Sequence, residues 1–229
     1  MVSLPMKDAP SFKPVGDTGL LVTLADVADE AANAHVIALD HALAAAEVNG
    51  VKECIPALVN LLVYFDPLIT DHASVEAAVR ALFPLPDITA SDTTTHIIPV
   101  CYDAELCPDL LATAEATGLP PEQVIAAHAS AHLRVSMYGF APGYAYLSGL
   151  PPEIHVPRKK TALRAVPKGS ILIAGAQSIL TPLTMPTGWN IIGRSPAEVI
   201  SGSRFLFDVG DTVTFTRIPR ADLPERLQT

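Results

Sequence analysis

The sequence predicts an α+β protein with a small ferredoxin-like N-terminal domain and a C-terminal β-barrel. Strand and helix signals alternate over residues 1–100, whereas after residue 133 helix signals nearly vanish and short apolar runs, separated by glycine and proline, take their place. The chain also carries 21 prolines among its 229 residues. Because proline interrupts helices and is common at turns and strand ends, this content disfavours a helical bundle.

The first domain is expected over residues 1–100. Four apolar runs predict strands at residues 19–24, 51–55, 58–65 and 94–100. Two stretches with apolar residues at helical spacing predict helices: residues 26–48, which Asn49-Gly50 ends, and residues 72–83, which Pro84 ends. The resulting β-α-β-β-α-β order is that of the ferredoxin-like split-βαβ arrangement.

The second domain is expected over residues 101–229, with a helical linker followed by the barrel. Residues 108–117 and 120–128 each begin with proline, as first helical turns often do, and Gly118 separates them. Five apolar runs then predict strands at residues 133–138, 170–174, 189–192, 205–207 and 212–218. Many short strands with such turns predict a closed or nearly closed β-barrel.

Composition excludes several classes of function. The formal net charge is −9 and no basic run occurs, so nucleic acid and anionic membranes are poor partners. No apolar stretch approaches the roughly 18 residues that a membrane helix needs, and residues 1–10 lack the apolar core of a signal peptide. We therefore expect a soluble, cytoplasmic protein. Three cysteines are too few for a disulfide framework, and Cys101 and Cys107 are expected to be ordinary small apolar residues.

The first candidate site is residues 139–147 (GFAPGYAYL), which hold three aromatic residues, two glycines and a proline. Aromatic faces beside exposed backbone suit a small planar ligand such as a lactam or an amide. The alternative is a hairpin whose aromatic side chains belong to the core, and composition alone favours it because glycine and proline chiefly mark turns.

The second candidate site is residues 157–164 (PRKKTALR), the densest positive cluster in an acidic protein. An arginine can bind a carboxylate or a phosphate through two parallel hydrogen bonds. The alternative is a solvated loop, which is preferred for Lys159 and Lys160 and stays open for Arg158 and Arg164.

The third candidate site joins residues 174–178 (AGAQS) to residues 186–189 (PTGW). Small residues let backbone N–H groups approach a ligand, and Gln177 supplies both a donor and an acceptor. For Trp189, the only tryptophan, core packing is an equal alternative.

Several familiar catalytic signals are missing. The sequence contains neither a G-x-x-x-x-G-K-[ST] phosphate loop nor a G-x-S-x-G nucleophile elbow. His128 and His132 could share one helix face as metal ligands, but no third ligand has convincing spacing. We therefore expect no metal site.

The joint order of several segments resembles the 5-oxoprolinase B-subunit family. This family is also named allophanate hydrolase subunit 1 and includes the sporulation kinase A inhibitor. The C-terminal segments that carry the resemblance are residues 139–150 (GFAPGYAYLSGL), 157–158 (PR), 166–170 (VPKGS), 173–177 (IAGAQ) and 186–196 (PTGWNIIGRSP). The N-terminal ones are residues 12–22 (FKPVGDTGLLV), 55–67 (IPALVNLLVYFDP) and 118–128 (GLPPEQVIAAH).

The resemblance implies a cyclophilin-like barrel and an enzyme subunit that is inactive alone. It would act with a larger homologous partner, the C-subunit of the same complex, to activate 5-oxoproline with ATP and Mg²⁺, and a third subunit would open the ring to give L-glutamate. Related domains form the carboxyltransferase part of urea carboxylase, but no biotin is expected on this chain. Two alternatives are an inhibitor of a sporulation-type histidine kinase and a carboxyltransferase subunit of the allophanate or urea carboxylase kind. Prolyl isomerase activity rests on fold analogy alone.

The resemblance also implies site residues. Arg158, Gln177 and Tyr146 are the expected catalytic residues. The expected substrate-binding residues are Phe140, Pro142, Gly143, Gly175, Gly188, Trp189 and Arg194, to which the basic cluster at residues 157–164 adds Arg164. In this scheme the two arginines of residues 157–164 hold a carboxylate or phosphoryl group, Gln177 and backbone amides near Gly175 orient the amide, and Tyr146 and Phe140 wall the pocket.

Three departures from the family pattern lie in the expected site. The second Pro-Arg pair of the family reads Leu163-Arg164, its Pro-Gly-Gly-Trp reads PTGW at residues 186–189, and its Gly-Gln-Thr-Gly-x-Tyr begins AQSIL at residues 176–180. A larger residue in place of glycine restricts the backbone and can fill a pocket.

Overall fold

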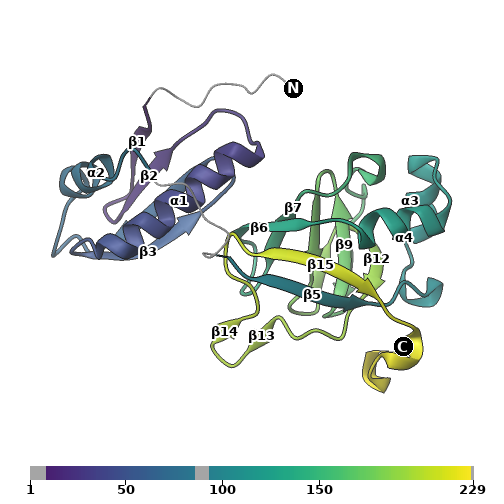
Figure 1. Cartoon of the computed structure of the whole chain (residues 1–229). Coiled ribbons are helices and arrows are strands. Elements are labelled where there is room, and N and C mark those ends of the chain that lie inside the picture. The colour runs from purple at the N-terminus through teal and green to yellow at the C-terminus, as the bar shows by residue number, and fades with distance from the viewer. Residues whose placement is uncertain (1–8, 86–92, 228–229) are drawn as a thin grey trace. The chain divides into compact units, whose positions relative to one another are not determined.

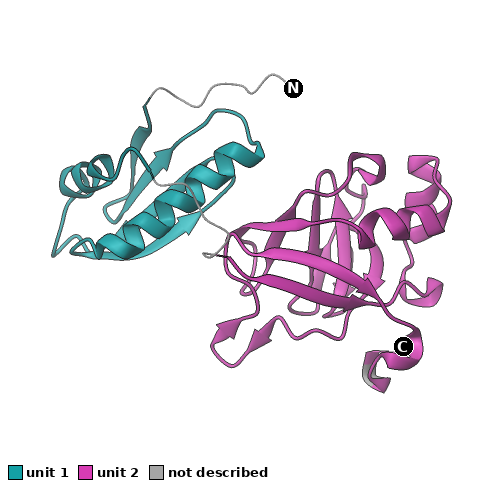
Figure 2. Cartoon of the chain, in the orientation of Figure 1, with its two compact units in different colours: residues 1–92 teal, residues 93–229 magenta. Residues whose placement is uncertain are grey.

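The computed structural model describes residues 9–85 and 93–227. The chain divides into two compact units, residues 1–92 and 93–229 (Figure 2). Each unit has its own hydrophobic core. No helix in the described ranges is long and apolar enough to cross a membrane.

The first unit is an antiparallel sheet with two helices packed against it (Figure 1). Its strands, in the spatial order β1-β2-β4-β3, are β1 (Ser11–Val15), β2 (Gly19–Thr23), β4 (Asn60–Phe65) and β3 (Val51–Pro56). The helices are α1 (Glu30–Ala46) and α2 (His72–Ala81). Asp29 and Asp71 begin them by accepting hydrogen bonds from backbone N–H groups of the first turn, as N-cap residues do.

The last strand predicted for the first domain lies in the second unit instead. It is observed as β5 (Thr95–Val100), which pairs in parallel with β15 (Thr212–Arg217). The first sheet is complete without it, because β1, which was not predicted, forms a short hairpin with β2 and occupies that edge of the sheet. Such a hairpin closes at small entropic cost, since its two strands are separated by only a few residues.

The second unit is a seven-stranded sheet that curls into a nearly closed barrel (Figure 1). Its remaining strands are β6 (Leu133–Tyr138), β7 (Ala145–Ser148), β9 (Ser170–Ala174), β10 (Gln177–Leu180) and β12 (Asn190–Arg194), and the spatial order is β12-β9-β10-β7-β6-β15-β5. The two ends of this sheet meet at Cys101 and Arg194, whose backbones exchange hydrogen bonds of 2.8 and 2.9 Å. The predicted α+β fold with a C-terminal barrel is therefore confirmed.

The predicted linker helices belong to the barrel unit. They are α3 (Leu110–Thr117) and α4 (Pro121–Ala129), and their apolar side chains join the same core cluster as residues from all seven strands. Two short ribbons complete the unit: β8 (Leu163–Val166) with β11 (Met185–Thr187), and β13 (Ile200–Ser201) with β14 (Arg204–Phe205). Because all seven strands of the main sheet contribute side chains to this cluster, it lies in the barrel interior.

His128 belongs to this interior. Tyr102 donates its hydroxyl to His128 Nδ1 at 2.7 Å, and His128 Nε2 lies 3.2 Å from Ser178 Oγ, which itself donates to the carbonyl of Leu172. The ring also stacks on Phe215 at 4.4 Å between centroids. These contacts satisfy the neutral imidazole, and no group of three or more potential metal ligands occurs in the described parts of the chain.

The cysteines of this unit are also core residues. Cys101 and Cys107 are buried, and burial raises the pKa of the Cys107 thiol to about 12. A thiol in such surroundings is unreactive, as expected from the sequence.

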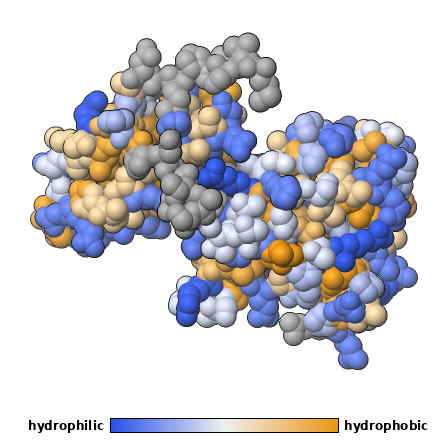
Figure 3. Space-filling model, in the orientation of Figure 1, coloured by the Kyte–Doolittle hydropathy of each residue, from blue (hydrophilic) through white to orange (hydrophobic). Residues whose placement is uncertain are grey.

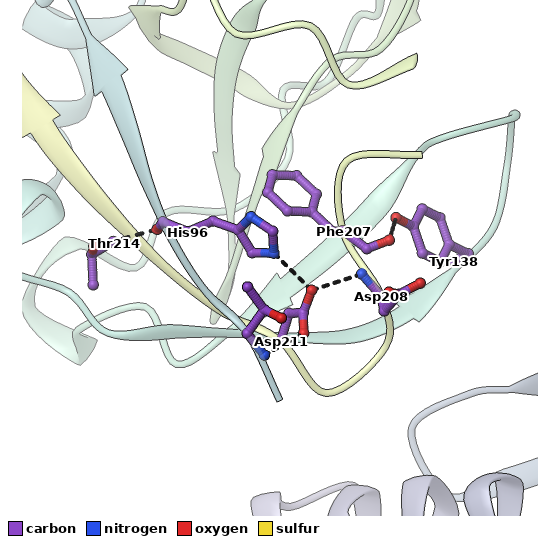
Figure 4. A network of polar contacts seen from close by, with 7 residues as sticks. His96, Tyr138, Phe207, Asp208, Asp211 and Thr214 are labelled. Carbon is purple, nitrogen blue, oxygen red and sulfur yellow. Dashed lines mark hydrogen bonds and ion pairs between the residues drawn. The ribbon is translucent and has the colours of Figure 1, made fainter. Parts of the chain in front are cut away.

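A buried polar network holds the start of β5 against β15 (Figure 4). Asp211 accepts from His96 Nε2 at 2.7 Å, from the backbone N–H of Thr94 at 2.8 Å and from that of Asp208 at 2.9 Å. Burial acts to raise the pKa of Asp211, but the hydrogen bonds from Asp208, Thr94 and His96 outweigh it and lower that pKa below its ordinary value. Asp211 therefore stays ionised and ties the first strand of the barrel to the last.

Candidate functional site

The candidate site lies on the outer face of the barrel sheet, the face turned away from the interior core. Side chains alternate between the two faces of each strand. On β10, Ser178 and Leu180 point inward, and on β7 so do Ala145 and Leu147. The residues that alternate with them along the strands, which include Tyr146 and Gln177, therefore lie on the outer face. There a second cluster forms, made by Tyr144, Val166, Leu172, Ala174, Ile179, Met185, Trp189 and Ile191.

An aromatic row crosses this outer face and ends under an arginine. Successive ring centroids are 5.2 Å apart for Phe140 and Tyr144, 5.3 Å for Tyr144 and Tyr146, and 6.0 Å for Tyr146 and Trp189. The guanidinium carbon of Arg158 lies 5.5 Å from the Trp189 ring centroid, which is cation–π range. The row runs from an exposed end, Phe140 at 69% exposed, to a buried one, Trp189 at 4%.

Gln177 lies beside this row. On paired antiparallel strands it is directly opposite Ser148, which shares a face of β7 with Tyr146. Its side-chain nitrogen Nε2 is buried and has no hydrogen-bond partner among the described residues. The structure thus brings Gln177, Tyr146, Trp189 and Arg158 to one face of the barrel.

Lys159 is an anchor rather than the solvated loop residue expected from the sequence. Its ammonium lies 2.5 Å from a carboxylate oxygen of Asp109, and its backbone N–H donates to the carbonyl of Gly188 at 2.6 Å. The same oxygen of Asp109 accepts from the backbone N–H of Ile191. Lys159 therefore links the segment that carries Arg158 to the segment that carries Trp189. Sequence inspection missed this pair because its members are 50 residues apart.

Two predicted site residues, Arg194 and Gly175, have structural roles. Arg194 is buried at 5% exposed and donates to the carbonyl of Lys168 and the hydroxyl of Ser170. Gly175 has φ +56° and opens the tight turn between β9 and β10, and its N–H donates to Val156 at 2.7 Å. Its amide is thus engaged within the chain, contrary to the expectation that it orients a ligand. Arg164 is exposed on β8.

The 139–143 loop owes its shape to Gly143 and Phe140. Gly143 has φ +71°, and a Cβ there would lie 2.9 Å from Ile200 and 3.3 Å from Pro182. Phe140 also has a positive φ of 69°, which is uncommon for a residue with a side chain and holds its ring outward. Pro142 is exposed between them. Glycine at 143 is therefore required by backbone geometry and close packing.

The departures from the family pattern are mostly buried. Thr187 accepts from the backbone N–H of Trp189 at 3.1 Å and shares a side-chain hydrogen bond with Tyr144. Ile179 and Leu180 are core residues, and Thr181, at the position of the expected tyrosine, donates to the carbonyl of Pro167. Thr187 and Ile179 are thus packed within the wall of the site, and Leu180 and Thr181 are buried.

These side chains can bind and orient a ligand, but none of them is an evident nucleophile or general base. Burial raises the pKa of Tyr144 to about 12, so its hydroxyl stays neutral. Arg158 offers positive charge, Gln177 a free amide donor, and the rings flat apolar contact. Such a surface suits a small planar anion.

Comparison with known proteins places this geometry in a family. Residues 10–205 match the model of the carboxyltransferase domain, subdomain C and D. The chain is 30% identical over 226 residues to the 5-oxoprolinase B-subunit of Bacillus subtilis (strain 168), a match that covers 92% of this chain and 94% of that protein. The chain belongs to the 5-oxoprolinase B-subunit family. The Escherichia coli O157:H7 protein of the same name is 38% identical over 121 residues, 52% of this chain and 56% of that one.

Several solved structures are similar to this chain. The protein TTHA0988 is similar with a TM-score of 0.80 and 31% identity over 91% of this chain, which spans only 41% of that longer chain. PH0987 of Pyrococcus horikoshii is 32% identical with a TM-score of 0.55, and the match covers 93% of this chain and 99% of that one. Kluyveromyces lactis urea carboxylase, at 15% identity and a TM-score of 0.72, shares the fold over 96% of this chain and 23% of its own.

Proposed function

We propose that this chain is one subunit of an ATP-dependent amidohydrolase of the 5-oxoprolinase type, acting with a larger homologous subunit. The observation that carries the proposal is Arg158 held over Trp189, beside an aromatic row and a glutamine amide without a partner among the described residues. Family membership supplies the reaction class, since the named relatives are subunits of 5-oxoprolinase.

In this proposal, each residue of the candidate site binds a different part of the reactants. Arg158 holds an anionic group of the reactants, either the carboxylate of 5-oxoproline or a phosphoryl group in transit. Gln177 orients the lactam amide, and Tyr146 and Phe140 contact the flat ring. ATP activates the lactam, and a third, ring-opening subunit completes its conversion to L-glutamate.

A partner subunit is part of the proposal because this chain lacks an evident complete site. No phosphate loop occurs in the sequence, and the candidate residues lie on an outer wall. We place ATP and Mg²⁺ at a site that the larger subunit completes, in a cytoplasmic complex. The greater length of TTHA0988, of which this chain matches 41%, is consistent with a companion part in related proteins.

The test is ATP hydrolysis stimulated by 5-oxoproline. The chain alone is expected to be inactive, and the chain purified with its larger partner is expected to be active. Arg158→Ala is expected to lower kcat/KM about 10- to 100-fold, as loss of a charged hydrogen bond of about 1.5–3 kcal/mol predicts. The control is Lys160→Ala, which removes the same charge from a neighbouring position of the same segment. Full activity in the Arg158 variant would remove the central assignment.

A second candidate function is inhibition of a histidine kinase, and exposed apolar side chains favour it. Phe140, Leu183 and Phe205 are exposed on the barrel unit, and Figure 3 shows hydrophobic residues at the surface of both units. The contacts of Gly143 with Pro182 and Ile200 bring together the three segments that carry these residues. A pull-down that recovers a kinase and no larger subunit would favour inhibition over hydrolysis.

A further inference from the structure

A row of three polar residues crosses the outer face of the barrel beside the aromatic row. Arg134 on β6 and Gln177 on β10 both lie directly opposite Ser148 on β7, one from each side. Leu133, Val135 and Leu147, their neighbours along the strands, point into the interior core, so Arg134 shares the outer face with Gln177. Neighbouring strands lie about 4.8 Å apart, which puts the backbones of Arg134 and Gln177 roughly 10 Å apart with short Ser148 between them.

Both long side chains of this row carry donors without acceptors. Arg134 Nε and Gln177 Nε2 are buried and have no hydrogen-bond partner among the described residues. Arg194 Nε and Thr113 Oγ1 also lack a partner among the described residues, but neither lies on these three strands. Three other arginines do have an acceptor. Arg80 pairs with Glu76, Arg217 with Glu122 and Arg220 with Glu105. Burying a donor without an acceptor costs stability, so unpaired donors that gather on one row point to an acceptor from outside the chain.

The chemistry of the row selects the acceptor. Arg134 and the amide nitrogen of Gln177 donate, and the Ser148 hydroxyl already donates to Ser136. The row holds one positive charge, which matches a group with one negative charge. A carboxylate accepts at both oxygens and carries that charge, so it satisfies both donors at once.

We propose that Arg134 and Gln177 form a carboxylate-binding site above Ser148. Arg134, Ser148 and Gln177 are each partly exposed, so a small ligand reaches them by rotation of side chains, without unfolding. Tyr146 lies two residues along β7 on the same face, and a ring attached to the carboxylate would meet it. Resting on the proposed function, the site takes the carboxylate of the lactam substrate and leaves Arg158 for the phosphoryl group. Gln177 then donates to the carboxylate through Nε2 and accepts from the lactam N–H through Oε1.

The direct test uses acetate as the probe and needs no partner subunit. In ¹⁵N–¹H spectra of the full chain, acetate is expected to shift the Arg134 Nε–H and Gln177 side-chain signals with one common dissociation constant. Acetamide, which has the same shape without the charge, is expected to bind at least 10-fold more weakly. Arg134→Gln is expected to weaken acetate binding at least 10-fold, whereas Arg204→Gln, at an exposed arginine on β14, is expected to leave it unchanged. Acetate that moves neither signal would overturn the site.

A second variant tests the site without any ligand. Gln177→Glu keeps the shape of the side chain and supplies a carboxylate next to Arg134. It is expected to raise the melting temperature and abolish acetate binding, and a lowered melting temperature would count against the proposal. Activity separates this site from the proposed function. If acetate binds but the complex shows no 5-oxoproline-stimulated ATP hydrolysis, the carboxylate site is supported and the proposed function is refuted. If the complex is active and Arg134→Gln leaves the KM for 5-oxoproline unchanged, the proposed function is supported and the carboxylate site is refuted.

Discussion

The buried His128 makes a quantitative prediction about stability and pH. Burial lowers the pKa of His128 to about 3 in the folded protein, whereas an unfolded histidine titrates near 6.5. Below pH 6.5 the unfolded chain therefore binds a proton that the folded chain does not. As pH is lowered below 6.5, the free energy of unfolding is therefore expected to decrease by about 1.4 kcal/mol per pH unit, or about 2 kcal/mol in total by pH 5.

The assay is urea unfolding at pH 7, 6 and 5, with wild type compared against His128→Gln. The variant is less stable at pH 7, because it loses the stacking on Phe215 and the fit to Tyr102. It has no titrating group at this position, so its disadvantage should shrink by about 2 kcal/mol at pH 5. Contributions from the rest of the chain are common to both proteins and cancel in the difference. A disadvantage that stays constant from pH 7 to pH 5 would refute the assignment of a neutral, buried imidazole.

Three further predictions concern single positions. Gly143→Ala is expected to lower the free energy of unfolding by about 1–3 kcal/mol, because the new Cβ would lie 2.9 Å from Ile200 at a residue with positive φ. Gly202→Ala, where φ is +61° and nothing lies within 4 Å, should show a smaller loss in thermal unfolding. Asp211→Asn is expected to lower stability by about 1–3 kcal/mol at pH 7. Because the pKa of Asp211 is lowered in the folded protein, its carboxylate stabilises the fold above the unfolded pKa, and this stabilisation is lost as pH falls through the folded pKa. In denaturant titrations below about pH 4, the unfolding free energies of wild type and Asp211→Asn should therefore converge. Trp189 is the only tryptophan, so Arg158→Ala should alter its emission and increase quenching by acrylamide, and an unchanged spectrum would contradict the observed stacking.

The elements of the fold were largely predictable from local patterns, but their pairing was not. Prolines at or just before the first turn identified α3 and α4. Short apolar runs identified β6, β9, β12 and β15, whereas β7 and β10 were not predicted as strands. The run at residues 94–100 was recognised as a strand and assigned to the wrong sheet. Its partner β15 lies more than a hundred residues further on, and a local pattern carries no information about so distant a partner.

The candidate site was predictable only where its residues are unusual in themselves. The single tryptophan, the aromatic run and the basic cluster stand out in composition, and Trp189, Tyr146 and Arg158 do meet. Arg194 stood out equally and proved to be a buried structural residue. Arg134 was missed because its significance comes from a row across three strands, and strand register is a property of the folded sheet.

Side chains from all seven strands of the barrel sheet meet in its interior core. The candidate residues therefore lie on the outside of the barrel. Under the proposed function, a reactant held there has to be screened from water by another polypeptide, and assembly of the complex would be the step that excludes solvent.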